Sequence, residues 1–346
     1  MDEKRYPAFL IGLLSLCHMG IDFLCAFSLY HSFTSFWQVF LLYNFFAFAG
    51  QLPLGILLDA WTDRTKEELF PGYLFTFAGI ALTIAGAVFQ PVILGLGNAF
   101  FHVGGGVLTI REDDHVSYKG RGLGVFVAPG AIGLILGILI YDTPHYDLIR
   151  ILVSILLAAI MAVIFLTGRE REAGEIPLPL DRRDTLIAGA CCFLVVVLRS
   201  LTGMAIVFSW KTTPLIIFLS VLSLAFGKTA GGFLSSWIGM KKTVLLTLSL
   251  SAVCFYFGEN IYAGMAALFL FNMTMPMTLY LIKKVLPAYP GAAFGVLTFA
   301  LFLGYLPVLY GFIRDVSPFP LGTASSLVSL VILLIALWIY ERDGHE

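Results

Sequence analysis

Long apolar runs separated by short polar segments dominate the chain. Twelve runs reach the roughly 20 residues that a helix needs to cross the hydrocarbon core of a bilayer, and we expect a transmembrane helix at each. They lie at about 7–30, 35–58, 70–89, 91–110, 122–141, 147–167, 185–209, 213–236, 242–258, 261–282, 291–313 and 320–340. The longest polar stretch separates six of them from six. The pattern predicts an N-terminal bundle at 1–167, a cytoplasmic linker at 168–184 and a C-terminal bundle at 185–346.

The basic residues of the loops predict how the chain crosses the membrane. If the N-terminus is cytoplasmic and the chain alternates, the outer loops hold only Lys211 and Arg314. Cytoplasmic loops are rich in Lys and Arg, so this bias supports an even number of helices with both termini in the cytoplasm. We expect a multi-pass protein of the cell (plasma or inner) membrane. The sixteen basic residues on the predicted cytoplasmic side are Lys4, Arg5, Arg64, Lys66, Arg111, Lys119, Arg121, Arg169, Arg171, Arg182, Arg183, Lys241, Lys242, Lys283, Lys284 and Arg342.

Composition agrees with lipid as the solvent. Of the 346 residues, 59% are hydrophobic and 12% are charged, whereas soluble domains are about a quarter charged. A net charge of −1 gives no basic field for nucleic acid. The first apolar run continues to Tyr30, which is too long for a signal peptide. The five cysteines lie in apolar runs without zinc spacing, so we interpret them as buried apolar residues: Cys17, Cys25, Cys191, Cys192 and Cys254.

The two halves carry similar segments in the same order. Gly55-Ile-Leu-Leu-Asp59 corresponds to Gly232-Phe-Leu-Ser-Ser236. The segment from Ser117 to Val125 corresponds to that from Ala288 to Val296, and Asn98 corresponds to Asn272. The three separations along the chain are nearly equal, and each is close to half the chain length. Such a constant offset indicates a duplicated six-helix unit.

Two of these segments resemble a marker of the major facilitator superfamily, G-x-L-[AS]-D-R-x-G-R-[RK]. The second copy keeps Gly232, Gly239, Lys241 and Lys242 but has Ser236 where Asp is usual. The first copy keeps Gly55, Asp59 and Arg64 but lacks the later glycine and the basic pair. The resemblance covers the whole chain. It implies an all-α membrane fold with twelve transmembrane helices in two pseudo-symmetric six-helix bundles, and a secondary transporter that is not an enzyme.

Further fragments narrow the resemblance. The fifth predicted helix has Gly124, Pro129, Gly130, Gly133 and Gly137, a glycine-proline pattern that this family associates with exporters. The alternative is ordinary packing through small residues. The segments His18-Met-Gly-Ile-Asp22 and Gly95-Leu-Gly-Asn98-Ala-Phe-Phe-His102 are similar to those of fosmidomycin-resistance and drug exporters, except that Val103 replaces the usual proline.

Ionisable side chains at membrane depth are costly, so they are candidates for function. His18 and Asp22 are four residues apart and share a helix face, and both side chains can exchange protons. We predict that Asp22 couples transport to protons, with His18 as its neighbour or relay. The alternative is a structural ion pair between Asp22 and Arg199.

The remaining candidates come from the resemblance, which implies that helices one, four, seven and ten line a central cavity. Asn98, His102, Arg199, Thr202 and Asn272 would then contact the solute, and Lys228 is a further candidate. The guanidinium of Arg199 stays charged and needs an anionic or carbonyl partner. The mid-membrane excess of cations favours an anionic or zwitterionic small organic solute. Lys228 can instead form a structural pair or snorkel.

Two further motifs were considered as a nucleotide site and a metal site. Gly227-Lys228-Thr229 has Leu222 where a phosphate loop needs its first glycine, so no ATP or other cofactor is predicted. The polar run Arg111–His115 is interpreted as a solvated loop, not a metal site. We predict a monomeric, proton-coupled transporter with efflux preferred over uptake. The alternatives are a uniporter, an anion exchanger, or a receptor or scaffold without transport; an intramembrane enzyme would need a metal or nucleophile constellation.

Overall fold

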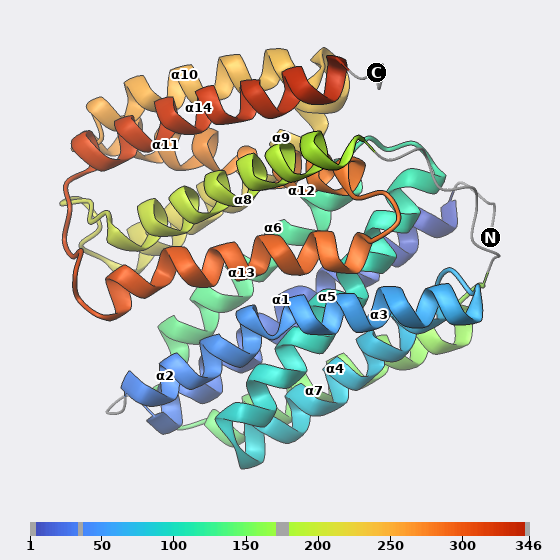
Figure 1. Cartoon of the computed structure of the whole chain (residues 1–346). Coiled ribbons are helices and arrows are strands. Elements are labelled where there is room, and N and C mark those ends of the chain that lie inside the picture. Colours follow the sequence, from blue (N-terminus) through green and yellow to red (C-terminus); the bar gives the residue numbers. More distant parts are fainter. Residues whose placement is uncertain (1–4, 34–36, 171–179, 343–346) are drawn as a thin grey trace. The chain divides into compact units, whose positions relative to one another are not determined.

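The computed structural model describes residues 5–33, 37–170 and 180–342. Regular structure in these ranges is helical, apart from isolated β-bridge residues such as Ile206 and Val316, which pair with each other. The helices are labelled in Figure 1: α1 (Arg5–Phe33), α2 (Trp37–Asn44), the π-helix η1 (Phe45–Ala49), α3 (Gln51–Thr65), α4 (Phe70–Phe89), α5 (Pro91–His115), α6 (Arg121–Ile140), α7 (Tyr146–Thr167), α8 (Arg182–Ala205), α9 (Pro214–Ile238), α10 (Met240–Tyr256), α11 (Ile261–Asn272), α12 (Thr274–Val285), α13 (Pro290–Leu309) and α14 (Pro318–Arg342).

The helices match the predicted spans. Eleven spans of the described chain are long and apolar enough to cross a membrane, and the 17-residue α10 occupies the place of the remaining predicted span, 242–258. Two predicted spans consist of more than one element. The span predicted at 35–58 contains α2, η1 and α3, and the span predicted at 261–282 contains α11 and α12.

Both interruptions have local causes. In the second span the Gly50 N–H donates to the Phe45 carbonyl, five residues back, which defines a π turn. In the tenth span Pro276 has no N–H, so the carbonyl of Asn272 loses its partner four residues on. The α-helix is therefore broken at Met273, between α11 and α12.

One predicted loop is wrong. The helix α5 continues through Arg111–His115, and the side chains of Glu112 and Asp113 are buried. The apolar run ends at Ile110, and hydropathy marks where apolar residues stop, not where a helix stops. Glu is a good helix former, so the helix extends beyond the apolar run.

The chain divides into two compact units. The first contains Met1–Ser117, Val125–Glu175 and Tyr289–Gly295, and the second contains Tyr118–Gly124, Ile176–Ala288 and Val296–Glu346. Each unit thus includes the start of one helix, α6 or α13, whose remainder belongs to the other unit. Lys4, Arg171 and most of the predicted linker at 168–184 lie outside the described residues, so the linker and the domain boundaries stay predictions.

In the first unit, α4 packs along α5 through small residues. A Cβ at Gly79 would overlap the backbone of Phe101, and one at Gly97 would overlap the backbone of Thr83. Such glycines let two helix backbones approach closely. This packing places α5, which carries two of the candidate residues. Glycines recur every seven residues on both helices, at Gly72, Gly79 and Gly86 on α4 and at Gly97 and Gly104 on α5.

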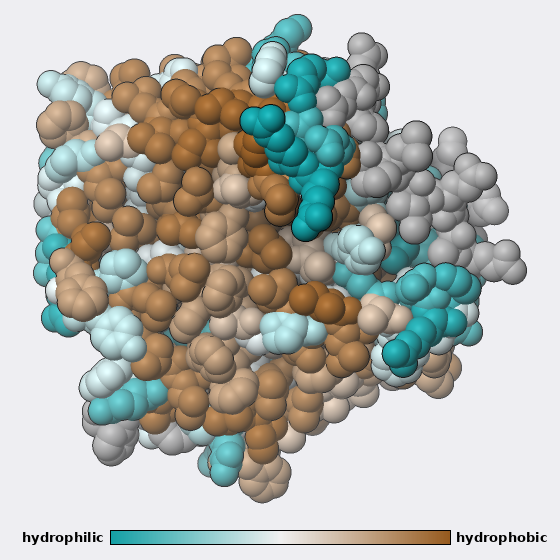
Figure 2. Space-filling model, in the orientation of Figure 1, coloured by the Kyte–Doolittle hydropathy of each residue, from teal (hydrophilic) through white to brown (hydrophobic). Residues whose placement is uncertain are grey.

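Apolar side chains cover much of the outer surface. Figure 2 shows hydrophobic residues over most of the face in view, with hydrophilic residues gathered near its edges. On α7 the exposed side chains include Ile151, Leu152, Ile155, Phe165 and Leu166. Monomeric soluble proteins rarely expose so large an apolar surface, so this surface fits a protein embedded in lipid.

Candidate functional site

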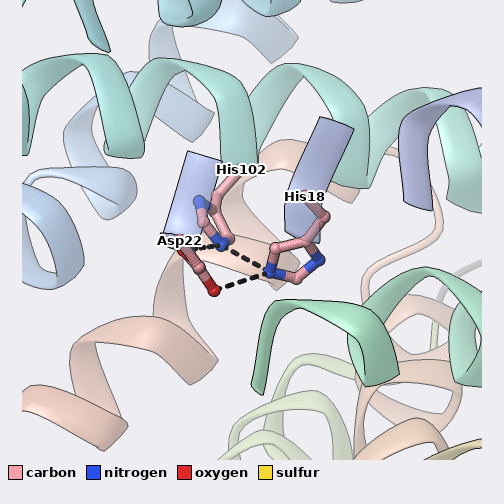
Figure 3. Close-up of side chains that lie close together, drawn as sticks. All are labelled: His18, Asp22 and His102. Carbon is pink, nitrogen blue, oxygen red and sulfur yellow. Dashed lines mark hydrogen bonds and ion pairs between the residues drawn. The ribbon is translucent and has the colours of Figure 1, made fainter. Parts of the chain in front are cut away.

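Four of the predicted site residues meet inside the first unit. His18 and Asp22 lie one turn apart on α1, and Asn98 and His102 lie one turn apart on α5. Asp22 Oδ2 is 3.2 Å from His18 Nε2, and Asp22 Oδ1 is 3.7 Å from His102 Nε2. Figure 3 shows the two imidazoles and the carboxylate converging from these two helices. The i,i+4 spacing on each helix brings both pairs to one shared face.

The hydrogen bonds of the two imidazoles determine where their protons lie. His18 Nδ1 is 2.7 Å from the carbonyl oxygen of Phe126, and His102 Nδ1 is 2.8 Å from that of Asn98. A carbonyl oxygen only accepts, so each Nδ1 must carry a hydrogen. The two Nε2 atoms face each other at 2.8 Å. One of them must therefore hold a second hydrogen, since two bare lone pairs would repel at that distance.

These distances fit a cluster of one imidazolium, one imidazole and one carboxylate. His18 and His102 are buried, and Asp22 is mostly buried. A proton shared by the two histidines would balance the charge of Asp22 and leave the cluster neutral as a whole. A buried charge without such a partner is strongly unfavourable.

Asn98 completes the polar contacts of Asp22. Its Nδ2 donates to Asp22 Oδ1 at 3.0 Å and lies 3.7 Å from Cys25 Sγ. Its Oδ1 is buried and has no hydrogen-bond partner in the described chain. Cys25 is a free, buried thiol, as predicted for the cysteines. The amide orients the carboxylate and keeps an acceptor available beside it.

The helix α6 closes the cluster from a third side. Besides the Phe126 carbonyl, it provides the Phe126 ring, whose centroid is 4.9 Å from that of His18. A Cβ at Gly130 would overlap His18 Nε2 and Asp22 Oδ2. Sequence reasoning did not single out Gly130 as a site residue; its signal was its place beside Pro129 in the glycine-proline pattern.

In the described chain, His18, Asp22 and His102 could also hold a metal ion. Their possible ligand atoms lie within 4.8 Å of one another. The distances fit a shared proton better. Two imidazoles bound to tetrahedral zinc at about 2.0–2.1 Å place their nitrogens roughly 3.3 Å apart. The 2.8 Å between the two Nε2 atoms is the length of a hydrogen bond.

The other predicted solute contacts lie in the second unit. Arg199 of α8 is 8% exposed, and its Nη1 has no hydrogen-bond partner in the described chain. Thr202, one turn on, donates to Ser325 Oγ at 2.7 Å. Asn272 Nδ2 donates to the Leu268 carbonyl at 2.9 Å. Lys228 of α9 is half-buried and has interactions of its own. The pairing of Asp22 with Arg199 would join the two units and stays a prediction.

The first copy of the sequence marker binds a helix start. Asp59 of α3 accepts hydrogen bonds from the Gly291 and Ala292 N–H groups, at 2.8 and 2.7 Å. A Cβ at Gly55 would overlap the Gly291 carbonyl. A carboxylate at a helix N-terminus satisfies N–H groups that have no partner in the helix. The side chain of Arg64 is exposed.

The second copy contacts the start of α6 through a side-chain hydrogen bond instead. Arg121 Nε donates to Ser236 Oγ at 2.5 Å, and a Cβ at Gly232 would overlap the backbone of Gly120 or Arg121. Gly239 ends α9 with φ +88°, a value that favours glycine. Lys241 pairs with Glu341 at 3.1 Å, and Lys242 is exposed. Pro129 lies inside α6, where it removes one backbone hydrogen bond.

These features define a polytopic helical membrane protein with a buried, protonatable cluster in one of its units. No family model and no curated protein match the sequence. Solved structures do. The human organic anion transporter MFSD10 (TETRAN) is 15% identical with a TM-score of 0.68, over 97% of this chain and 100% of that chain.

Two structures of the fucose:proton symporter FucP are also similar. The symporter from E. coli is 14% identical with a TM-score of 0.63, over 98% of this chain and 99% of that chain. FucP in the outward conformation, described as a major facilitator superfamily transporter, is 15% identical with a TM-score of 0.61 and covers 98% and 99%. The predicted fold is confirmed: this chain has the major facilitator fold. The resemblance to the drug-exporter branch stays a prediction.

Proposed function

We propose that this protein is a secondary transporter that moves a small organic solute by alternating access of its two six-helix halves, coupled to protons at His18, Asp22 and His102. The observation that carries the proposal is the 2.8 Å approach of the Nε2 atoms of two buried histidines beside a carboxylate, a distance that a proton shared between them would give. Intramembrane clusters of this kind are typical of proton relays in transporters. The major facilitator fold supports it, since the similar solved structures are transporters.

Loss of the shared proton would force the cluster to rearrange. Without it, two lone pairs face each other at 2.8 Å and the charge of Asp22 has no balancing cation. The imidazoles must then separate or rotate, which breaks the Nδ1 bonds to the Phe126 and Asn98 carbonyls. These carbonyls belong to α6 and α5, so deprotonation acts on the packing of three helices. This is the physical basis for coupling protons to a conformational change.

The guanidinium of Arg199 supports an anionic or zwitterionic solute, because one of its nitrogens has no hydrogen-bond partner in the described chain. Buried Arg199 needs a partner for Nη1, and a carboxylate or phosphate of the solute would satisfy it bidentately. Asn98, Thr202, Lys228 and Asn272 are the proposed further contacts. MFSD10 is described as an organic anion transporter. We propose efflux by antiport, on the glycine-proline pattern of α6; uptake by symport would use the same residues.

The test is transport in proteoliposomes that contain a pH-sensitive dye. Fucose and a panel of small organic anions are added under an imposed pH gradient, and both the interior pH and the solute are followed. We expect a transported solute to move protons in the wild type. Asp22→Asn should reduce gradient-driven transport at least tenfold while solute exchange without a gradient persists, because an amide cannot exchange the proton. Asp63→Asn, at an exposed aspartate of α3, is the matched control.

Other outcomes would select other functions. Gradient-driven transport at the wild-type rate in Asp22→Asn would refute the coupling site. Transport that does not depend on the pH gradient would indicate an anion exchanger if it requires counter-solute, and a uniporter if it does not. Saturable binding without transport of any solute would indicate a receptor or scaffold.

We further propose a monomer in the cell membrane with both termini cytoplasmic, as the loop charges predict.

A further inference from the structure

Four helix ends of the second unit surround a cavity of about 540 Å³. They are the end of α9, the start of α10, the end of α12 and the end of α14. The lining combines lysines, tyrosines and apolar side chains, and it is separate from the His18–Asp22–His102 cluster of the first unit. The lining residues that matter here are Lys241, Lys242, Lys284, Tyr280, Tyr340 and Glu341.

The lining of the cavity is cationic. It contains three lysines and a single acid, Glu341, which pairs with Lys241 at 3.1 Å. Lys284 Nζ lies 5.3 Å from the centre of the Tyr280 ring. Lys242 is exposed and forms no ion pair with another residue of the described chain. Among the residues of the lining, lysines therefore outnumber acids three to one.

Tryptophans place this cavity at the depth of lipid headgroups. Trp237 precedes the lining residue Ile238 on α9, and Trp338 follows the lining residue Leu337 on α14. Their side chains are 67% and 57% exposed. Tryptophan on the outer surface of a membrane protein gathers at the interface between hydrocarbon and water. The ends of four helices meet beside these tryptophans, so we infer that the lysines lie at the level of lipid phosphates.

We propose that this cavity binds the phosphate group of an anionic lipid. Lysines and a tyrosine hydroxyl supply donors for phosphate oxygens. The side chains of Ile238, Leu281 and Leu337 supply apolar walls for the first carbons of the acyl chains. Basic pockets between transmembrane helices are suited to such headgroups. Free phosphate shares the headgroup chemistry, but it makes no use of the apolar walls or of the interfacial depth. The site does not depend on the proposed transport function.

The test is the thermal stability of the purified full chain in detergent. Phosphatidylcholine, phosphatidylglycerol and inorganic phosphate are added in separate arms at matched phosphate concentration. A ligand that binds only the folded protein raises its melting temperature. We expect phosphatidylglycerol to raise it by several degrees more than phosphatidylcholine does. The Lys242→Gln/Lys284→Gln double variant should lose at least half of that difference, whereas Lys66→Gln, at an exposed lysine after α3, should keep it.

A gain-of-binding variant guards against misfolding of the double variant. Glu341→Gln removes the one acid of the lining and releases Lys241 from its pair, so it should increase the response to phosphatidylglycerol. Equal responses to the two lipids, or an unchanged response in both the double variant and Glu341→Gln, would overturn the proposal. A response to inorganic phosphate as large as that to phosphatidylglycerol, and equally sensitive to the lysines, would retain the phosphate site but assign it to free phosphate.

Discussion

At the scale of single residues, Gly130 is the most exacting position of the candidate site. A side chain there has no room, because a Cβ would overlap both His18 Nε2 and Asp22 Oδ2. We predict that Gly130→Ala displaces the His18 ring and breaks its 2.8 Å contact with His102. Gradient-driven transport in the proteoliposome assay should then fall at least tenfold. Gly12→Ala, on α1 with open space around its Cβ, should leave transport unchanged.

The readouts of this variant distinguish local from global damage. A Gly130→Ala protein with the wild-type melting temperature but without proton movement fits the displaced cluster. Wild-type proton movement in Gly130→Ala would show that the site tolerates a methyl group, contrary to the geometry. If Gly130→Ala loses both transport and folding, His102→Gln tests the cluster instead, because it removes the shared proton without adding volume.

Sequence reasoning located most of this cluster but not its connectivity. The i,i+4 spacing predicted that His18 and Asp22 share a face, and the structure confirms that they are in contact. His102 was predicted to contact the solute, which stays a prediction, and its contact with His18 and Asp22 was not foreseen. Spacing along one helix fixes which residues share a face. It does not fix which residue of another helix arrives opposite, since that depends on packing between distant segments.

At the scale of helices, the seven-residue glycine pattern of α4 and α5 should govern stability. A Cβ at Gly79 would overlap the backbone of Phe101, one position before His102. Overpacking typically costs about 1–3 kcal/mol, more than the roughly 1 kcal/mol that alanine gains over glycine in a helix interior. We predict that Gly79→Ala lowers the melting temperature in detergent. Gly203→Ala on α8, with nothing within 4 Å of its Cβ, should leave it equal or higher.

A melting temperature for Gly79→Ala at or above that of Gly203→Ala would show that α4 and α5 can separate without cost.

The helices themselves were well predicted, since α4 matches the predicted span 70–89. The breaks were not. A π turn and the interruption at Met273 arise from individual hydrogen bonds. Hydropathy averaged over the length of a whole span does not resolve such local events.

At the scale of the whole molecule, most of the fold could be predicted from the loop charges and the apolar runs. Sixteen basic residues on one predicted side against two on the other supported the even helix count, and the major facilitator fold has since confirmed the architecture at only 14–15% identity to the similar structures. This fold depends on span length and order more than on residue identity, because lipid accepts any apolar side chain. The solute is different: its recognition depends on a few polar atoms whose partners the sequence does not reveal.

Arg199 is the buried cation that we expect to recognise the solute. If Arg199 binds an anionic solute, an organic anion that stabilises the wild type should no longer stabilise Arg199→Gln, and Asp22→Asn should keep that response. At 100 times its dissociation constant such a ligand adds about 2.7 kcal/mol, which a thermal-shift assay detects easily. Arg64→Gln, at an exposed arginine of α3, is the charge-matched control.

The structural alternative, an ion pair between Asp22 and Arg199 across the two units, makes a different prediction. Removing one partner would leave an uncompensated buried charge, and each single variant would lose about 3–5 kcal/mol. The Asp22→Asn/Arg199→Gln double variant would then recover much of that loss, as coupled residues do in a double-mutant cycle. Because Asp22 already has the cation shared by His18 and His102 in its own unit, we expect the two losses to be additive. A large coupling energy would assign Arg199 to the ion pair instead of the solute.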